Sequence, residues 1–167
     1  MCGIIGIIST REVSSRIVNS LKKLEYRGYD SAGIATLVNG NINEVKCEGR
    51  VDVLEKDISK LNLKGDIGIG HVRWATHGKP SKVNAHPHSS EQVSVVHNGI
   101  IENSTILKKL LEKKGYIFKS QTDTEVIAHL VSEYLKKNSL KDTIIKLLKK
   151  LHGSFALGII FKNKNDL

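Results

Sequence analysis

Apolar residues in this chain recur with two different spacings, and this alternation restricts the possible folds more than any other feature of the sequence. Four segments repeat apolar residues every three or four positions, as amphipathic helices do: 13–24, 106–111, 126–135 and 144–151. Six shorter runs are rich in strand-forming residues: 4–8, 31–38, 42–47, 66–72, 92–97 and 154–161. The chain is therefore predicted to combine helices and strands.

Two Asn-Gly pairs lie between strand-forming residues, in TLVNGNINEV and in SVVHNGIIEN. Asn-Gly is the strongest local signal for a tight hairpin turn, so both stretches are interpreted as hairpins and the sheets as at least partly antiparallel. Strands grouped in hairpins, with helices in sequence pairs, favour sheets covered by helix layers over a doubly wound parallel sheet. The predicted fold class is α+β.

Local signals mark several helix ends. Ser139 and Asp142 resemble a capping box before the last helix, and Thr122 and Glu125 resemble one before the third. Gly115 is a plausible stop for the second helix. The strand at 154–161 runs into a polar tail, so we expect either an edge strand or a sequence that continues further.

The net charge of +9 suggests an anionic partner, but much of it lies in lysine pairs within segments of helical periodicity, where a solvated helix face is the simpler interpretation. With few aromatic residues available for base stacking, no nucleic-acid partner is predicted. No segment is apolar enough to span a membrane. The two cysteines, Cys2 and Cys47, are too few for a disulfide scaffold, which favours a cytoplasmic location.

Cys2 directly follows the initiator methionine. Methionine aminopeptidase removes Met1 when the next side chain is small, so the mature chain is expected to start with a cysteine that carries a free α-amino group. A thiol (pKa about 8.5) and an α-amine (about 7.7 to 8.0) on one residue supply a nucleophile and a base together. A small buried cysteine on an N-terminal strand is the competing interpretation.

Five motifs bear on this choice: MCGIIG, LEYRGYDSAGIA, GHVRWATHGKPSKVNAHPHS, VVHNGIIEN and SQTDTEVIAHL. Together they resemble the glutaminase half of the glucosamine-6-phosphate synthase family, within the class II glutamine amidotransferases. The resemblance covers nearly the whole chain. It implies an N-terminal nucleophile (Ntn) hydrolase fold, a four-layer αββα sandwich of antiparallel sheets, in which Cys2 attacks the side-chain amide of glutamine. No metal or organic cofactor is implied.

Asn98 and Gly99 are the expected oxyanion donors. Hydrolysis at a thiol needs donors aimed at the oxygen of the tetrahedral intermediate. The resemblance assigns this role to the side-chain amide of Asn98 and the backbone N–H of Gly99, whose missing side chain would let the substrate approach. A plain hairpin turn is the alternative, and the two interpretations are compatible.

The substrate is an α-amino acid, so its pocket needs a cation and an anion. Arg73 suits a carboxylate, because a guanidinium grips it with two parallel hydrogen bonds. By resemblance Arg73 and Asp123 bracket the glutamine backbone, and Thr76 and His77 add contacts. The plainer interpretations are a surface arginine and a helix-start acid.

The stretch RWATHGKP is expected to be a loop that closes over the substrate, since Gly78 and Pro80 punctuate it. Its Trp74 is interpreted either as a core residue or, by resemblance, as a residue near the ammonia exit. The resemblance also implies supporting roles behind Cys2 for Arg27, Gly28, Asp30, Gly33 and His86. The seven histidines lack the companions of a metal site, so none is predicted.

These inferences give one incomplete class II glutamine amidotransferase domain over 1–167, without the sugar-phosphate isomerase domain of the family. The predicted reaction is glutamine hydrolysis through a Cys2 thioester, which supplies ammonia for making glucosamine-6-phosphate. Fructose-6-phosphate enters only through the absent domain, and a homodimer is expected for the full-length protein. The alternatives are an amidotransferase of the purine-pathway type and a basic binding module without enzymatic activity.

Overall fold

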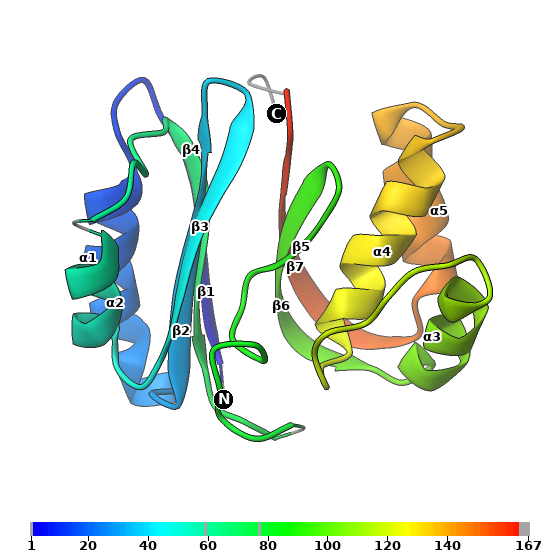
Figure 1. Ribbon diagram of the computed structural model, residues 1–167, viewed down its shortest axis with the longest axis horizontal. Helices are drawn as coiled ribbons and strands as arrows, with labels where there is room; N and C mark the ends of the chain where they lie inside the picture. Colours follow the sequence, from blue (N-terminus) through cyan, green and yellow to red (C-terminus); the bar gives the residue numbers. More distant parts are fainter. Residues whose placement is uncertain (1, 59, 77, 164–167) are drawn as a thin grey trace.

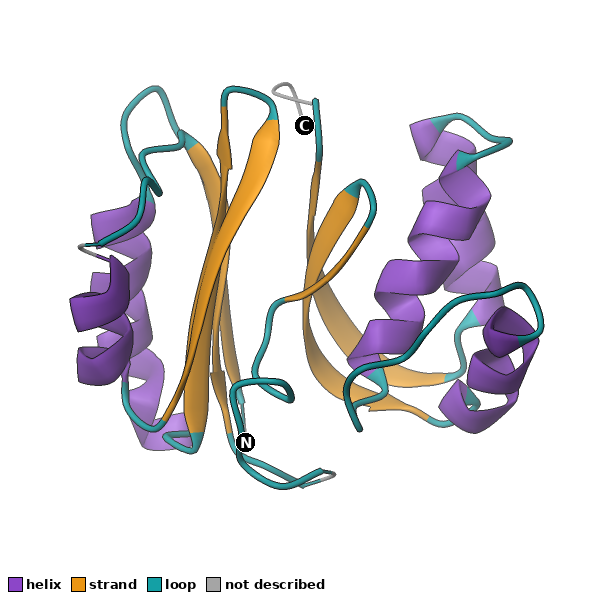
Figure 2. Ribbon diagram, viewed as in Figure 1, coloured by secondary structure: helices purple, strands orange, loops and turns teal. Residues whose placement is uncertain are grey.

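The computed structural model describes residues 2–58, 60–76 and 78–163, in which two antiparallel sheets are stacked between two layers of helices (Figure 2). The first sheet has the strand order β1-β4-β2-β3 and the second β5-β6-β7. The strands are β1 (Gly3–Ile8), β2 (Ser31–Val38), β3 (Asn41–Glu48), β4 (Ile67–Arg73), β5 (His88–Ser90), β6 (Val93–Ile101) and β7 (Gly153–Phe161). This is the predicted αββα arrangement.

The outer face of the first sheet is covered by α1 (Ser14–Leu24) and α2 (Val51–Ile58), on the left in Figure 1. A short 3-10 turn, η1 (Glu25–Arg27), follows α1. Gly68 and Gly70 of β4 let α1 approach closely, because a Cβ at Gly70 would lie 2.5 Å from Ile17 Cγ2. Ile17 is fully buried, so the two glycines allow α1 to pack tightly on the sheet.

The second sheet is covered by α3 (Ser104–Glu112), α4 (Thr124–Leu135) and α5 (Leu140–Lys150), on the right in Figure 1. Of these, α4 is the most buried, because nine consecutive residues from Thr124 to Ser132 are buried. Side chains from β6, β7 and all three helices form one apolar cluster. The helices are therefore held by burial of their apolar stripes.

A separate apolar cluster fills the space between the two sheets, with Ile69 of β4 and Val96 of β6 among its members. Successive side chains of a strand point to opposite faces, so β6 directs Val96 and Asn98 toward the first sheet and His97 toward α4. The same alternation places His71 and Arg73 of β4 on the inner face with Ile69. Polar side chains thus continue the inner layer beyond its apolar part.

The first predicted hairpin is confirmed. Asn39 and Gly40 connect β2 to β3 and have φ angles of 50° and 77°, as a type I′ turn requires. The second hairpin is wrong, because Asn98 and Gly99 lie inside β6, which pairs with β7 from Val93 to Ile101. Nine paired residues override the local turn preference there.

Of the two capping predictions, one is confirmed and the other is wrong. Ser139 Oγ accepts from the backbone N–H of Asp142 at 3.1 Å, which confirms the start of α5. The Thr122 capping box is wrong: Asp123 is the N-cap of α4, and Glu125 instead accepts from the backbone N–H groups of Lys119 and Ser120. The sequence interpretation also missed α2 and β5.

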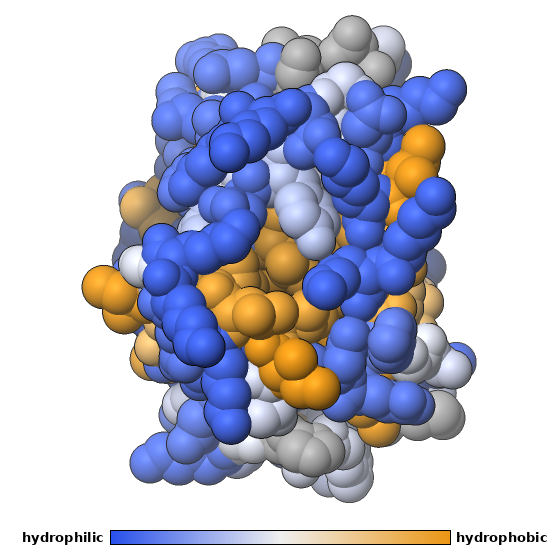
Figure 3. All heavy atoms as spheres, turned by 90° about the vertical axis from the view of Figure 1, so that its right-hand side faces the viewer, coloured by the Kyte–Doolittle hydropathy of each residue, from blue (hydrophilic) through white to orange (hydrophobic). Residues whose placement is uncertain are grey.

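The face of the molecule formed by α3, α4 and α5 carries four lysine pairs, in or directly after these helices: Lys108/Lys109, Lys113/Lys114, Lys136/Lys137 and Lys149/Lys150. Figure 3 shows an apolar patch on this face, framed by hydrophilic side chains. The exposed apolar residues of α3 and α5 are Ile106, Leu110, Ile145 and Leu148. No helix in the described ranges is long and apolar enough to cross a membrane.

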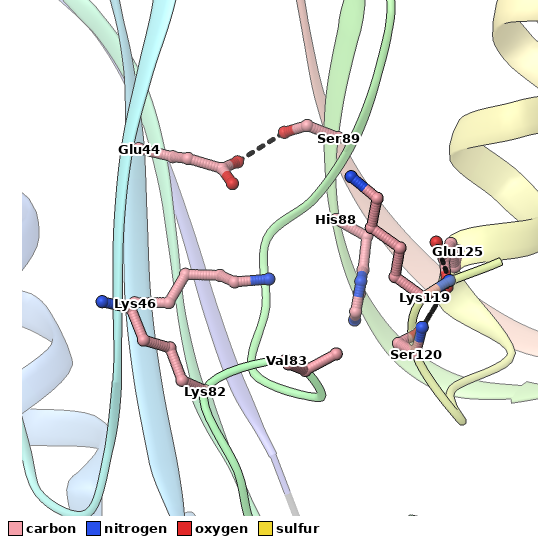
Figure 4. A pocket seen from close by; sticks show the side chains of 9 residues that line it. All are labelled: Glu44, Lys46, Lys82, Val83, His88, Ser89, Lys119, Ser120 and Glu125. Carbon is pink, nitrogen blue, oxygen red and sulfur yellow. Dashed lines mark hydrogen bonds between the residues drawn. The ribbon is translucent and has the colours of Figure 1, made fainter. Parts of the chain in front are cut away.

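A cavity of about 400 Å³ separates the sheets at the edge formed by β3 and β5 (Figure 4). Glu44 of β3 accepts a hydrogen bond from Ser89 of β5 across this edge, and Lys46 Nζ donates to the Pro87 carbonyl at 3.1 Å. Burial lowers the pKa of Lys46. These polar contacts tie the sheets together where the apolar layer ends.

Candidate active site around Cys2

Cys2 lies immediately before β1, at the end of the inner layer between the sheets. Its Sγ accepts a hydrogen bond from the backbone N–H of Trp74 at 3.4 Å and lies 3.6 Å from the Trp74 carbonyl oxygen. Pairing of Gly3 with Val72 brings the start of β1 beside the end of β4. The position of the thiol is thus set by the register of β1 on β4.

Two adjoining cavities open at Cys2. One, of about 50 Å³, is lined by Arg73, His86, His97, Asp123 and Thr124, among others. The other, of about 470 Å³, includes Arg27, Asn98, Ser154 and Phe155. Both include Cys2, Trp74, Thr76, Gly99 and Ile100. Motifs far apart in the sequence therefore meet at one place.

Asn98 projects from β6 toward Cys2. Its Nδ2 donates to the backbone carbonyl of Cys2 at 3.0 Å, and its buried Oδ1 has no hydrogen-bond partner among the described residues. An amide nitrogen carries two hydrogens, so one remains available after this bond is made. The side chain thus fixes the backbone of Cys2 and lines the same cavity as the cysteine.

Gly99 needs to be glycine for a reason that the sequence interpretation missed. Its φ is +128°, and a Cβ would lie 2.1 Å from the Ser154 carbonyl oxygen of β7. The expectation that the missing side chain serves substrate approach does not account for this contact. Close pairing of β6 with β7 is the structural requirement.

Arg73 ends β4 and is buried, with 4% of its surface exposed. Its Nη2 donates to the Gly78 carbonyl at 3.1 Å, so it also holds the loop that follows Trp74. Burial lowers the pKa of Arg73, and the nearby Cys2, Asp30 and Asp123 oppose this effect. The surface-arginine interpretation is wrong for this side chain.

Residues 28–33 form a wall behind the Arg73–Trp74 backbone. A Cβ at Gly28 would lie 2.5 Å from the Arg73 carbonyl carbon, and a Cβ at Gly33 would lie 2.0 Å from the His86 carbonyl oxygen. Asp30 Oδ2 accepts from the Ala75 N–H at 2.7 Å. Glycine is required at 28 and 33 because backbone segments pack directly against them.

Asp123 reaches the small cavity from the N-terminus of α4. One oxygen, Oδ2, accepts from the backbone N–H of Ile101 at 2.8 Å. The other, Oδ1, lies 3.8 Å from His97 Nδ1, and 28% of the side chain is exposed. One oxygen is thus occupied by β6 while the carboxylate stays accessible from the Cys2 cavity.

Four buried histidines surround the inner side of the site. His71 and His86 stack with ring centroids 4.0 Å apart, and His86 meets His88 edge-on at 4.8 Å. Burial lowers the pKa of His71 and of His88 to about 3, and those of His86 and His97 also fall. Within the described part of the chain, no group of three or more His, Cys, Asp or Glu is placed to hold a metal ion.

Trp74 is 43% exposed and packs edge-on against Tyr29, with ring centroids 5.4 Å apart. It lines both cavities at Cys2, so the core interpretation is wrong. Thr76 is exposed beside it, and Arg27 lines the larger cavity. His77 lies outside the described residues.

Several residues at the site were not anticipated from the sequence: Ile100, Thr122, Thr124 and His97 line the small cavity. Ile100 and His97 flank the Asn98–Gly99 motif, and Thr122 and Thr124 flank Asp123. Proximity in sequence to the motif residues was the only signal. Which flanking side chains face the cavity depends on the packing of α4 against β6.

Comparison with known proteins identifies relatives of this chain. A family described as glutamine amidotransferase domain matches residues 71–167, more than half of the chain. The isomerizing glutamine–fructose-6-phosphate aminotransferase of Bradyrhizobium diazoefficiens is 52% identical over 100% of this chain, and that of Clostridium acetobutylicum is 54% identical over 99%. The chain spans 28% of the length of each relative.

Among solved structures, the chain is similar to the glutamine phosphoribosylpyrophosphate amidotransferase of B. subtilis, complexed with ADP and GMP. The TM-score is 0.83, with 32% sequence identity, covering 96% of this chain and 35% of that one. The neighbour confirms the predicted Ntn-type fold. On sequence and fold together, the chain belongs to the glutamine amidotransferase domain family.

Proposed function

We propose that this chain hydrolyses the side-chain amide of glutamine through Cys2, with its own α-amino group as the base. The thiol sulfur forms a bond to the amide carbonyl carbon while the α-amine takes the thiol proton. The amine passes that proton to the amide nitrogen, the C–N bond breaks, and ammonia leaves. Water then cleaves the thioester to glutamate and restores the thiol.

The observation that carries this proposal is the convergence of two contacts on Cys2: the backbone N–H of Trp74 donates to its Sγ at 3.4 Å, and the Asn98 side chain donates to its backbone carbonyl at 3.0 Å. Asn98 and the N–H of Gly99 are proposed to stabilise the tetrahedral oxyanion. Preorganised donors of this kind typically lower the barrier by about 3 to 4 kcal/mol each.

Substrate recognition is proposed to rest on Arg73 and Asp123. Asp123 accepts the α-ammonium of glutamine with its free oxygen, and Arg73 pairs with the α-carboxylate, with Thr76 and His77 adding contacts. Because Arg73 also binds the Gly78 carbonyl, carboxylate binding and loop closure are proposed to be coupled. Arg27, Gly28 and His86 support the wall of the site, and Trp74 borders the ammonia exit.

The ammonia is proposed to serve the conversion of fructose-6-phosphate to glucosamine-6-phosphate, with the sugar phosphate bound outside these residues. The 52% identity to relatives named for that activity supports this acceptor over a purine-pathway acceptor, because the phosphoribosylpyrophosphate enzyme is 32% identical. A cytoplasmic location and a homodimer remain predictions.

The test is glutamate release by the longest polypeptide that contains this chain, together with its intact mass. Active protein is expected to lack Met1, since acylation of the Cys2 nitrogen would make it a non-basic amide. Cys2→Ser should reduce glutamate release at least a thousandfold, the order of magnitude seen when a catalytic nucleophile is removed. Full activity with Met1 wholly retained would exclude the α-amine as the base.

A further inference from the structure

The hydroxyl of Thr124, the first residue of α4, contacts two histidines at once. Its Oγ1 lies 2.7 Å from His86 Nε2 and 3.0 Å from His97 Nδ1. All three side chains are buried, with exposures of 0%, 5% and 3% for Thr124, His86 and His97. A single hydroxyl thus joins α4 to β6 and to the loop before β5.

The Thr124 hydroxyl has few competitors for its two histidine partners. The His97 backbone carbonyl can only accept, so His71 Nε2, 3.1 Å away, carries its ring proton. Burial lowers the pKa of His86 and of His97, which keeps both rings neutral. The Thr124 hydroxyl has one hydrogen and two lone pairs, so it can bond to both rings. The other ring nitrogens, His86 Nδ1 and His97 Nε2, have no partner among the described residues. Among the described residues, Thr124 is therefore the one side-chain partner of the His86 and His97 rings within hydrogen-bond distance.

The junction lies next to Asp123 in the chain. The Asp123 carboxylate is held at Oδ2 by the Ile101 N–H, while Oδ1 lies 3.8 Å from the same His97 nitrogen that contacts Thr124. Asp123 makes no side-chain hydrogen bond of its own to cap α4. The direction of its carboxylate thus depends on where β6 and the start of α4 are fixed relative to each other.

We propose that Thr124 is a positioning residue for glutamine recognition: through His97 and His86 it fixes the start of α4 so that Asp123 faces the α-ammonium of the substrate. This inference rests on the proposed role of Asp123. Thr124 is fully buried and its hydroxyl is engaged by His86 and His97, so its proposed effect on the ammonium passes through Asp123.

Thr124→Val tests this directly, because it removes the hydroxyl at nearly constant volume, and Thr124→Ser restores it. Thr143→Val is the matched control, since Thr143 is also fully buried but its hydroxyl has no partner in the described part of the chain. Two substrates are compared: glutamine, and glutaramate, which has the same amide and carboxylate but no α-amino group. The protein is the longest polypeptide containing this chain.

Thr124→Val is expected to raise KM for glutamine about tenfold, with kcat within about twofold of the unsubstituted protein. Its kcat/KM for glutaramate should stay unchanged. Thr124→Ser and Thr143→Val should keep both substrates at the unsubstituted values. A KM effect on glutamine alone, rescued by serine, is not produced by general loosening of the fold.

An equal loss for glutamine and glutaramate, or a loss in kcat alone, would overturn the proposal and leave Thr124 a purely structural residue. If Thr124→Val fails to fold, glutamine and glutaramate are compared in the same way with Thr124→Ala, which also removes the hydroxyl. His97→Leu, which removes its histidine partner, is tested alongside. Absence of glutaminase activity in the unsubstituted protein would instead contradict the proposed function.

Discussion

The backbone N–H of Trp74 donates to the sulfur of Cys2 across 3.4 Å, although 72 residues separate the two in the chain. The contact joins the end of β4 to the residue before β1, the two strands being neighbours in the first sheet. The pairing of β1 with β4 therefore sets the position of the Cys2 sulfur beside the Trp74 backbone.

Cys2 is expected to react selectively with a glutamine-like electrophile. 6-Diazo-5-oxo-norleucine should alkylate Cys2 and spare Cys47, because Cys47 is 4% exposed and burial raises its pKa. Peptide mapping by mass spectrometry identifies the modified thiol, and excess glutamine should protect it. The Cys2→Ser variant serves as control and should remain unlabelled; equal labelling of both cysteines would argue against a specific site.

Substitutions at the site should separate binding from chemistry. Asp123→Ala and Arg73→Ala are expected to raise KM for glutamine, since they remove the partners of its ammonium and carboxylate. Asn98→Ala should lower kcat about 10²- to 10³-fold with a smaller change in KM, as for other oxyanion donors. Steady-state glutaminase assays measure both parameters. A loss of kcat at Asp123 with KM unchanged would assign this residue to the chemical step.

Gly28→Ala should lower glutaminase activity by displacing the backbone that contacts Cys2. The added Cβ would lie 2.5 Å from the Arg73 carbonyl carbon and 2.7 Å from the Trp74 nitrogen, so one of these segments has to move. Gly6→Ala is the matched control, because its Cβ would meet nothing closer than 3.9 Å. Activity and thermal midpoint are measured for both. Equal activity in the two variants would show that the wall at residue 28 can shift without affecting Cys2.

Buried neutral histidines should make the fold sensitive to acid. The pKa of His71 falls to about 3 in the folded chain, mainly through burial, against 6.5 for an exposed histidine. Between these values the unfolded chain binds more protons, so His71 contributes stability above pH 6.5 that is lost progressively as the pH falls toward 3. Urea unfolding at pH 7.5, 6 and 5 measures this loss.

The control for this prediction replaces one histidine at a time. His71→Gln should reduce the slope of the unfolding free energy against pH by up to the contribution of about one bound proton. His152→Gln, at an exposed position, should leave this slope unchanged. An unchanged slope in His71→Gln would mean that this ring is protonated equally in both states.

These 167 residues by themselves are expected to form no glucosamine-6-phosphate from glutamine and fructose-6-phosphate. They span 28% of the length of the curated relatives, and no phosphate-loop pattern occurs in the sequence. Glutamate and amino sugar are assayed separately. Even glutamate release is expected to be weak, because β7 pairs only with β6 among the described strands and its free edge can pair between chains. Substantial amino-sugar formation would place the acceptor site within this chain.

Local patterns in the sequence were enough for most of the elements, and the family resemblance pointed to several residues that line the cavities at Cys2. The periods of 2 and 3.6 identified the long strands and four helices, and the motifs around Cys2, Arg73, Asn98 and Asp123 identified side chains that the fold brings to two adjoining cavities. Family resemblance carried the assignment of roles, because periodicity alone does not distinguish a catalytic cysteine from a buried one.

Only the tertiary structure decided the rest. Asn98–Gly99 has the same local turn preference as Asn39–Gly40, but hydrogen bonds from β7, more than 50 residues later, keep it inside a strand. The partners of Thr124, Glu125 and Asp123 were likewise out of reach, because they depend on how α4 packs against β6. A sequence pattern records preferences of neighbouring residues, whereas these contacts arise from burial that joins distant segments.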